Sequence, residues 1–174
     1  MGGAAAASLL APLTPEERLR LGTLLHARRR PGQYRTLDAR QASLVAEIAE
    51  TIIPVTDTPG AKDVGITEFV DLLLTEWYTA EEREAFLGGL AAIDGESARA
   101  EGTPFTALNA DGRARVLTPL DGAQGPLDSA AGAFGRMKSL TVYGYFTSRE
   151  VQTSVLETVI IPGRYDGCVT MEPT

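Results

Sequence analysis

Four carboxylates that could do chemistry gather in one short stretch of the sequence. Asp57 and Asp63 lie among prolines and glycines, and Glu68 and Asp71 follow, three residues apart. Carboxylates held close together can share a divalent cation or a proton. Asp is also a common turn residue, because its side chain accepts hydrogen bonds from nearby backbone N–H groups. We therefore expect Asp57 and Asp63 to hold their own loop, and Glu68 and Asp71 to form a solvated helix face.

Other catalytic groups are scarce. The single histidine, His26, precedes three arginines at the expected end of a helix, where its usual role is to interact with the helix dipole or to cap. Residues 60–67 have the glycine spacing of a phosphate-binding loop, but Ile66 stands where the lysine is required. Neither a dinucleotide fingerprint nor a nucleophile elbow is present. The sequence therefore predicts no catalytic residue and no cofactor or metal site in this chain.

Composition narrows the classes of function further. The chain has 174 residues, with 16 Lys and Arg against 23 Asp and Glu, so its net charge is −7. A protein that holds nucleic acid through its phosphates needs a basic face, so we expect no nucleic-acid partner. The single cysteine, Cys168, excludes an internal disulfide. In a cytosolic protein such a cysteine is usually an inert buried thiol. In an exported protein it indicates a reactive thiol or a bond to another chain, which makes Cys168 a candidate for an intersubunit disulfide.

Helix caps and apolar periodicity predict an all-α fold. Thr14 and Thr79 each precede a glutamate by three residues, which is the pattern of a capping box. Further caps at Asp38, Asn109 and Ser148 start other helices, and no alternating pattern is long enough for a sheet. We expect one domain over residues 14–174, a compact bundle of about six helices with long irregular loops.

Two segments are distinctive outside the expected helices. Residues 54–65, the central loop, hold two residues each of Pro, Gly, Asp and Thr, and should form an ordered turn-rich loop. After a helix that we expect to end at Val142, aromatic residues cluster around Gly144. Tyrosine is common at protein interfaces, so the tyrosines are candidates for partner contact or for the core, and Phe146 for the core.

The first 13 residues form an uncharged stretch of Ala, Gly and Leu that ends abruptly at a charged segment. This stretch is too short to span a bilayer and matches the later part of an export signal. One interpretation is that Met1 is an internal methionine of a longer precursor that carries a twin-arginine leader. The other is an Ala/Gly tail on a cytosolic protein.

Three ordered motifs resemble the gluconate 2-dehydrogenase subunit 3 family. They are T-D-T-P-G-A at residues 56–61, G-Y-F-T-S at 144–148 and P-G-x-Y-x-G-C at 162–168, and the similarity runs from about residue 40 to residue 168. The resemblance implies a small accessory subunit of a periplasmic dehydrogenase complex. In such complexes a large flavoprotein of the glucose-methanol-choline type binds FAD and oxidises a sugar, polyol or sugar acid. A cytochrome c subunit with haem c takes the electrons onward.

The resemblance also implies how this chain would act. It would be exported with the flavoprotein by a twin-arginine signal, help it to mature, and stay bound to it, reaching the membrane only through its partners. We expect the contact to involve the central loop, an aromatic segment and, covalently, Cys168; the residues are Asp57, Pro59, Gly60, Tyr143, Tyr145 and Tyr165. Two other hypotheses stay open: a small metal-dependent enzyme that uses Asp57 and Asp63, and a cytosolic helical adaptor.

Overall fold

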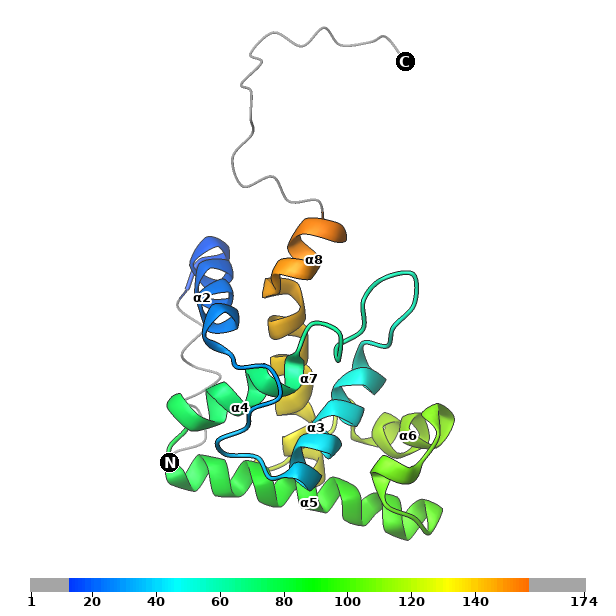
Figure 1. Ribbon diagram of the computed structural model, residues 1–174. Helices are drawn as coiled ribbons and strands as arrows, with labels where there is room; N and C mark the ends of the chain where they lie inside the picture. The colour runs from blue at the N-terminus through cyan, green and yellow to red at the C-terminus, as the bar shows by residue number, and fades with distance from the viewer. Residues whose placement is uncertain (1–12, 157–174) are drawn as a thin grey trace, which may run out of the picture.

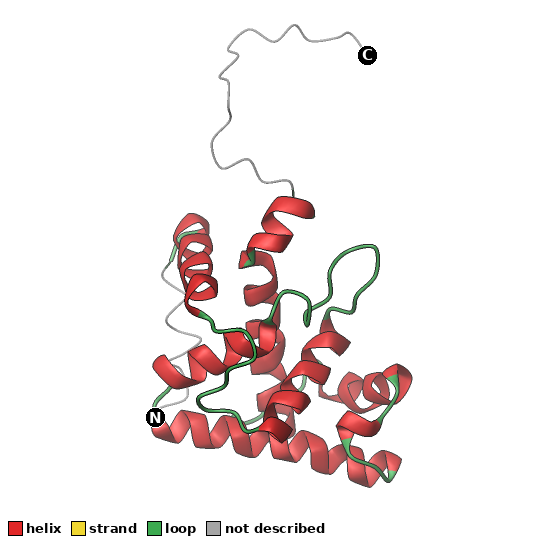
Figure 2. Cartoon of the chain, in the orientation of Figure 1, coloured by secondary structure: helices red, strands yellow, loops and turns green. Residues whose placement is uncertain are grey.

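The computed structural model describes residues 13–156 and confirms the all-α fold (Figures 1 and 2). The described residues form seven α-helices and two short 3₁₀-helices, and no strand. In chain order the elements are α2 (Pro15–Arg28), α3 (Ala39–Ile52), α4 (Ile66–Glu76), α5 (Ala80–Glu101), η1 (Phe105–Ala107), α6 (Ala110–Leu117), η2 (Thr118–Leu120), α7 (Ala130–Thr147) and α8 (Arg149–Ser154).

The expected caps start the helices. Thr14 and Thr79 form capping boxes, each accepting a backbone N–H at 3.2 Å from the residue three positions on. Asp38 does the same at the start of α3, over 2.8 Å. Each cap satisfies a helix N–H that has no partner within the helix and contributes about 1 kcal/mol. These starts depend on residues close in sequence, which is why they could be predicted.

Helix α7 is the centre of the bundle. It packs against α2, α3, α4 and α5, and α5 lies across the base of the molecule from which α7 rises (Figure 1). The core between these helices contains large side chains that are fully buried, among them Phe69 on α4, Phe86 on α5 and Met137 on α7. Burial of such side chains supplies most of the free energy that holds helices of this length together.

Helix α7 does not end at Val142 as predicted but continues to Thr147, so most of the aromatic segment is helical. Gly144 lies where α4 comes closest, and a Cβ atom there would sit 2.8 Å from Phe69 and 2.9 Å from Ile66. The missing side chain permits this close approach. Packing against α4 therefore offsets the roughly 1 kcal/mol that glycine costs inside a helix.

The side chain of His26 is buried between helices and does not cap α2. Its Nε2 lies 2.7 Å from the carbonyl oxygen of Gly144 on α7, and its ring stacks on Phe69 of α4 with centroids 4.7 Å apart. A carbonyl oxygen can only accept, so Nε2 carries the proton. Nδ1 is buried and has no hydrogen-bond partner within residues 13–156. The expected cap interaction is thus replaced by a contact among three helices.

The Glu68 and Asp71 face of α4 is also not the solvated surface that spacing predicts. Asp71 is only 3% exposed, and its carboxylate accepts backbone N–H groups from Arg35, Thr36 and Leu37 over 2.8–2.9 Å. Glu68 accepts the N–H of Gly32 at 3.0 Å. Hydrogen bonds to a charged acceptor are the stronger kind, so α4 fixes the connection between α2 and α3.

The environment of His26 predicts that acid destabilises the fold. Burial lowers the pKa of His26 below its ordinary value of 6.5, and the charge of Arg29 acts in the same direction, against the Gly144 carbonyl and Glu150. The unfolded chain therefore binds a proton more readily than the folded chain, and stability falls as the pH drops below 6.5. Urea unfolding measured from about pH 7.5 to about pH 5.5 avoids most carboxylate titration. His26→Gln should flatten this dependence, and an unchanged slope in the variant would contradict the assignment.

Candidate functional site

The central loop joins α3 to α4 and projects from the body of the helices (Figure 1). The carboxylate of Glu50 on α3 binds both ends of this loop. Its Oε1 accepts the N–H of Val55 and its Oε2 accepts the N–H of Lys62, each over 3.0 Å. The Lys62 ammonium in turn pairs with Glu47 on the same helix at 2.8 Å. The loop is therefore fixed to α3 at its beginning and near its end.

Inside the loop the backbone is packed too closely for a side chain at Gly60. A Cβ atom there would lie 2.5 Å from the Glu50 carboxylate and 2.7 Å from the nitrogen of Val55. The N–H of Gly60 donates to Asp63 at 2.9 Å. Asp63 thus has the turn-holding role that its position predicted, and glycine is required at this point by space rather than by an unusual φ angle.

A side chain from the other end of the sequence completes the anchoring. Tyr145 on α7 is 5% exposed, and its hydroxyl donates to the carbonyl oxygen of Pro59 at 2.8 Å. Two of the three sequence motifs are therefore in direct contact although 86 residues separate them. Tyr145 supports the loop from inside the protein and does not lie on its surface.

Apolar side chains are exposed both on the central loop and on α7. Val55 is 60% exposed, and Phe146 is 46% exposed with its ring 5.4 Å from that of Tyr145. The prediction that Phe146 is core is wrong, because the side of α7 that faces the loop is occupied by Tyr145. Val142, one turn before Phe146, is 39% exposed. We call Val55, Asp57, Val142 and Phe146 the loop surface.

The remaining predicted site residues lie in different parts of the structure. Asp57 is exposed in the central loop, where it accepts the hydroxyl of Thr56 at 3.0 Å. Tyr143 faces α2 and donates to the carbonyl of Arg18 at 2.8 Å, and burial raises the pKa of Tyr143 to about 12. The structure thus brings Asp57, Pro59, Gly60 and Tyr145 together and leaves Tyr143 apart. Tyr165 and Cys168 lie outside the described residues.

The two aspartates of the central loop, Asp57 and Asp63, make their hydrogen bonds within the loop itself. Residues 13–156 contain no group of three or more His, Cys, Asp or Glu side chains able to hold a metal ion. Sequence reasoning missed Glu50, the main anchor of the loop. The one available signal was an acidic residue near the end of α3, shortly before the loop.

No helix in the described part of the chain is both long and apolar enough to cross a bilayer.

The contact between Tyr145 and Pro59 predicts a measurable local effect. Tyr145→Phe keeps the ring but leaves the Pro59 carbonyl without its partner, which should cost about 1 kcal/mol and speed hydrogen exchange in the central loop. Tyr34→Phe is the matched control, because Tyr34 is exposed and its hydroxyl has no hydrogen-bond partner among the described residues. Equal loop exchange in both variants, measured by mass spectrometry, would show that Tyr145 does not anchor the loop.

Comparison with known proteins agrees with the motifs. The family model described as gluconate 2-dehydrogenase subunit 3 matches residues 39–163, a span that includes the central loop and the aromatic segment of α7. No curated protein and no solved structure gives a significant match. Because the matched residues make up well over half of the chain, it belongs to the gluconate 2-dehydrogenase subunit 3 family.

Proposed function

We propose that this chain is a non-catalytic accessory subunit that binds and stabilises the catalytic flavoprotein of a dehydrogenase complex acting on a sugar, polyol or sugar acid. The main support for this proposal is membership of the family, because its members are subunits of a multi-subunit dehydrogenase. The flavoprotein would be of the glucose-methanol-choline type and hold FAD, and a cytochrome c subunit with haem c would accept the electrons.

The loop surface is the contact we propose for the flavoprotein. Val55, Val142 and Phe146 expose apolar side chains, and burying them against a partner would be favourable. The loop that presents Val55 is already fixed by Glu50 and Tyr145. A surface that is ordered before binding loses less conformational entropy in the complex, so more of the contact energy appears as affinity.

We also propose export together with the flavoprotein into the periplasm through a twin-arginine signal. The apolar residues 1–13 support this, because they match the later part of such a signal. Tyr165 of this chain is a further residue that we propose contacts the flavoprotein.

The interface can be tested by co-expression with a tagged flavoprotein subunit. Phe146→Asp and Val55→Asp should each weaken the complex at least about tenfold, because a charge would be buried against an apolar patch. Leu24→Asp is the matched control, since Leu24 on α2 is 56% exposed and lies outside the loop surface. If both Phe146→Asp and Val55→Asp retained the complex, the loop surface would be excluded as the contact with the flavoprotein. Failure of the wild-type chain to co-purify, or oxidation of a sugar by the isolated chain, would overturn the proposed function.

The disulfide has a test of its own. If Cys168 bonds to the flavoprotein, a non-reducing gel of the purified complex shows a covalent species that Cys168→Ser removes. The non-covalent complex should survive in the variant, because the loop surface remains. A wild-type complex that migrates identically with and without reductant would contradict the disulfide but not the proposed function.

A further inference from the structure

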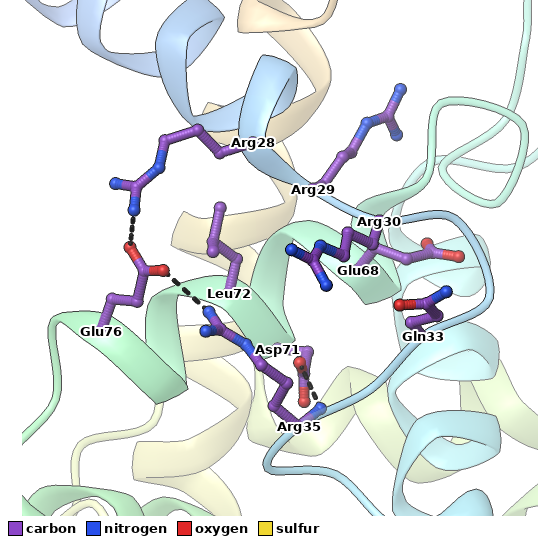
Figure 3. Close-up of a pocket in the computed structure, with 9 residues that line it drawn as sticks. All are labelled: Arg28, Arg29, Arg30, Gln33, Arg35, Glu68, Asp71, Leu72 and Glu76. Atoms are coloured by element: carbon purple, nitrogen blue, oxygen red, sulfur yellow. Dashed lines mark hydrogen bonds and ion pairs between the residues drawn. The ribbon is translucent and has the colours of Figure 1, made fainter.

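A pocket of about 420 Å³ lies between α4 and the connection from α2 to α3 (Figure 3). Four arginines line it, Arg28, Arg29, Arg30 and Arg35, together with three carboxylates on α4. Its volume is within the range of small-molecule sites. None of its lining residues belongs to the loop surface, so an inference about this pocket does not depend on the proposed function.

Most of the charged groups in the pocket are already engaged. Both oxygens of Asp71 accept backbone N–H groups, as described above. Glu76 alone holds two arginines, Arg28 at 2.9 Å and Arg35 at 2.8 Å (Figure 3). Arg29 turns away toward the Val64 carbonyl and pairs with Glu150 of α8 at 3.5 Å. One carboxylate therefore orients two guanidinium groups and leaves several of their N–H donors unused.

Arg30 is different from its neighbours. Its side chain makes no hydrogen bond or ion pair with any residue in the described range 13–156. Figure 3 shows its guanidinium directed over the pocket, toward α4. Of the carboxylates, Glu68 accepts the N–H of Gly32 with one oxygen, and its other oxygen has no partner in the described part of the chain. Within the pocket, unused donors therefore outnumber unused acceptors.

The surrounding sequence is basic in an acidic protein. Residues 13–40 contain seven arginines and three acidic residues, which gives +4, whereas the whole chain carries −7. Guanidinium groups present N–H donors in a planar fork that matches a carboxylate or phosphate group. We propose that this pocket binds a small organic anion through a carboxylate or phosphate group, with Arg30 as the main ligand and Arg28 and Arg35 as flanking donors.

The proposal is tested by calorimetric titration of the full chain with citrate and with inorganic phosphate at low ionic strength, with sodium chloride as the salt control. Citrate carries carboxylates and phosphate a phosphoryl group, so the two arms distinguish the two chemistries. Saturable binding of either anion is expected, and Arg30→Gln should weaken it about tenfold through loss of a charge-assisted contact. Because Arg30 is exposed and unpaired in the described structure, this variant should fold normally.

Two further variants make the result specific. Glu68→Gln removes a negative charge but keeps an oxygen for the N–H of Gly32, so it should tighten binding. Arg20→Gln removes the same charge as Arg30→Gln from an exposed site on α2 outside the pocket and should leave binding unchanged. The proposal would be overturned if neither anion bound saturably, or if both arginine variants lost the same affinity. It would also be overturned if a hexaglutamate peptide alone bound in a way that depends on Arg30. The last result would make the pocket a docking site for an acidic protein segment.

Discussion

The close contact of α7 with α2 and α4 at Gly144 determines how the rest of the molecule is arranged. Because Gly144 has no side chain, the Phe69 ring of α4 reaches the backbone of α7. The carbonyl at this position accepts His26 from α2. One turn on, Gly22 of α2 lies against Thr147, where a Cβ atom on the glycine would clash with the threonine side chain. Two glycines on two helices thus allow three helices to meet around one turn.

The same turn of α7 connects the core to the central loop. Tyr145 follows Gly144 directly in α7. Because Gly144 packs against α4, the side chain of Tyr145 points toward the central loop, and its hydroxyl donates to the Pro59 carbonyl. The next residue, Phe146, is left on the outside. The family motif G-Y-F-T-S therefore has a physical meaning in this fold: a close contact, a loop anchor, an exposed aromatic ring and, at Ser148, the cap of α8.

Two carboxylates hold two connections between helices in the same way. Glu50 and Asp71 each use a carboxylate to collect backbone N–H groups from a loop, and such hydrogen bonds fix a loop without apolar packing. This leaves the surfaces of both loops free for other contacts. Exposed apolar side chains lie on the central loop and on α7, whereas the connection between α2 and α3 is rich in guanidinium groups. The two regions therefore differ in the chemistry of what they can bind.

The sequence by itself determined the all-α class, the helix starts at Thr14, Asp38 and Thr79, and the turn role of Asp63. These features depend on hydrogen bonds between residues a few positions apart, which a linear pattern records. Membership of the family could also be recognised from the motifs.

Tertiary structure alone decided the extension of α7 through Gly144, the burial of Asp71 and His26, and the exposure of Phe146 instead of Tyr145. Glu50 and Arg30 gained their importance in the same way. In each case the outcome depends on which helix faces meet, and that is set by contacts between residues tens of positions apart. Hydropathy and spacing describe a side chain and its near neighbours, but not the element that will pack against it.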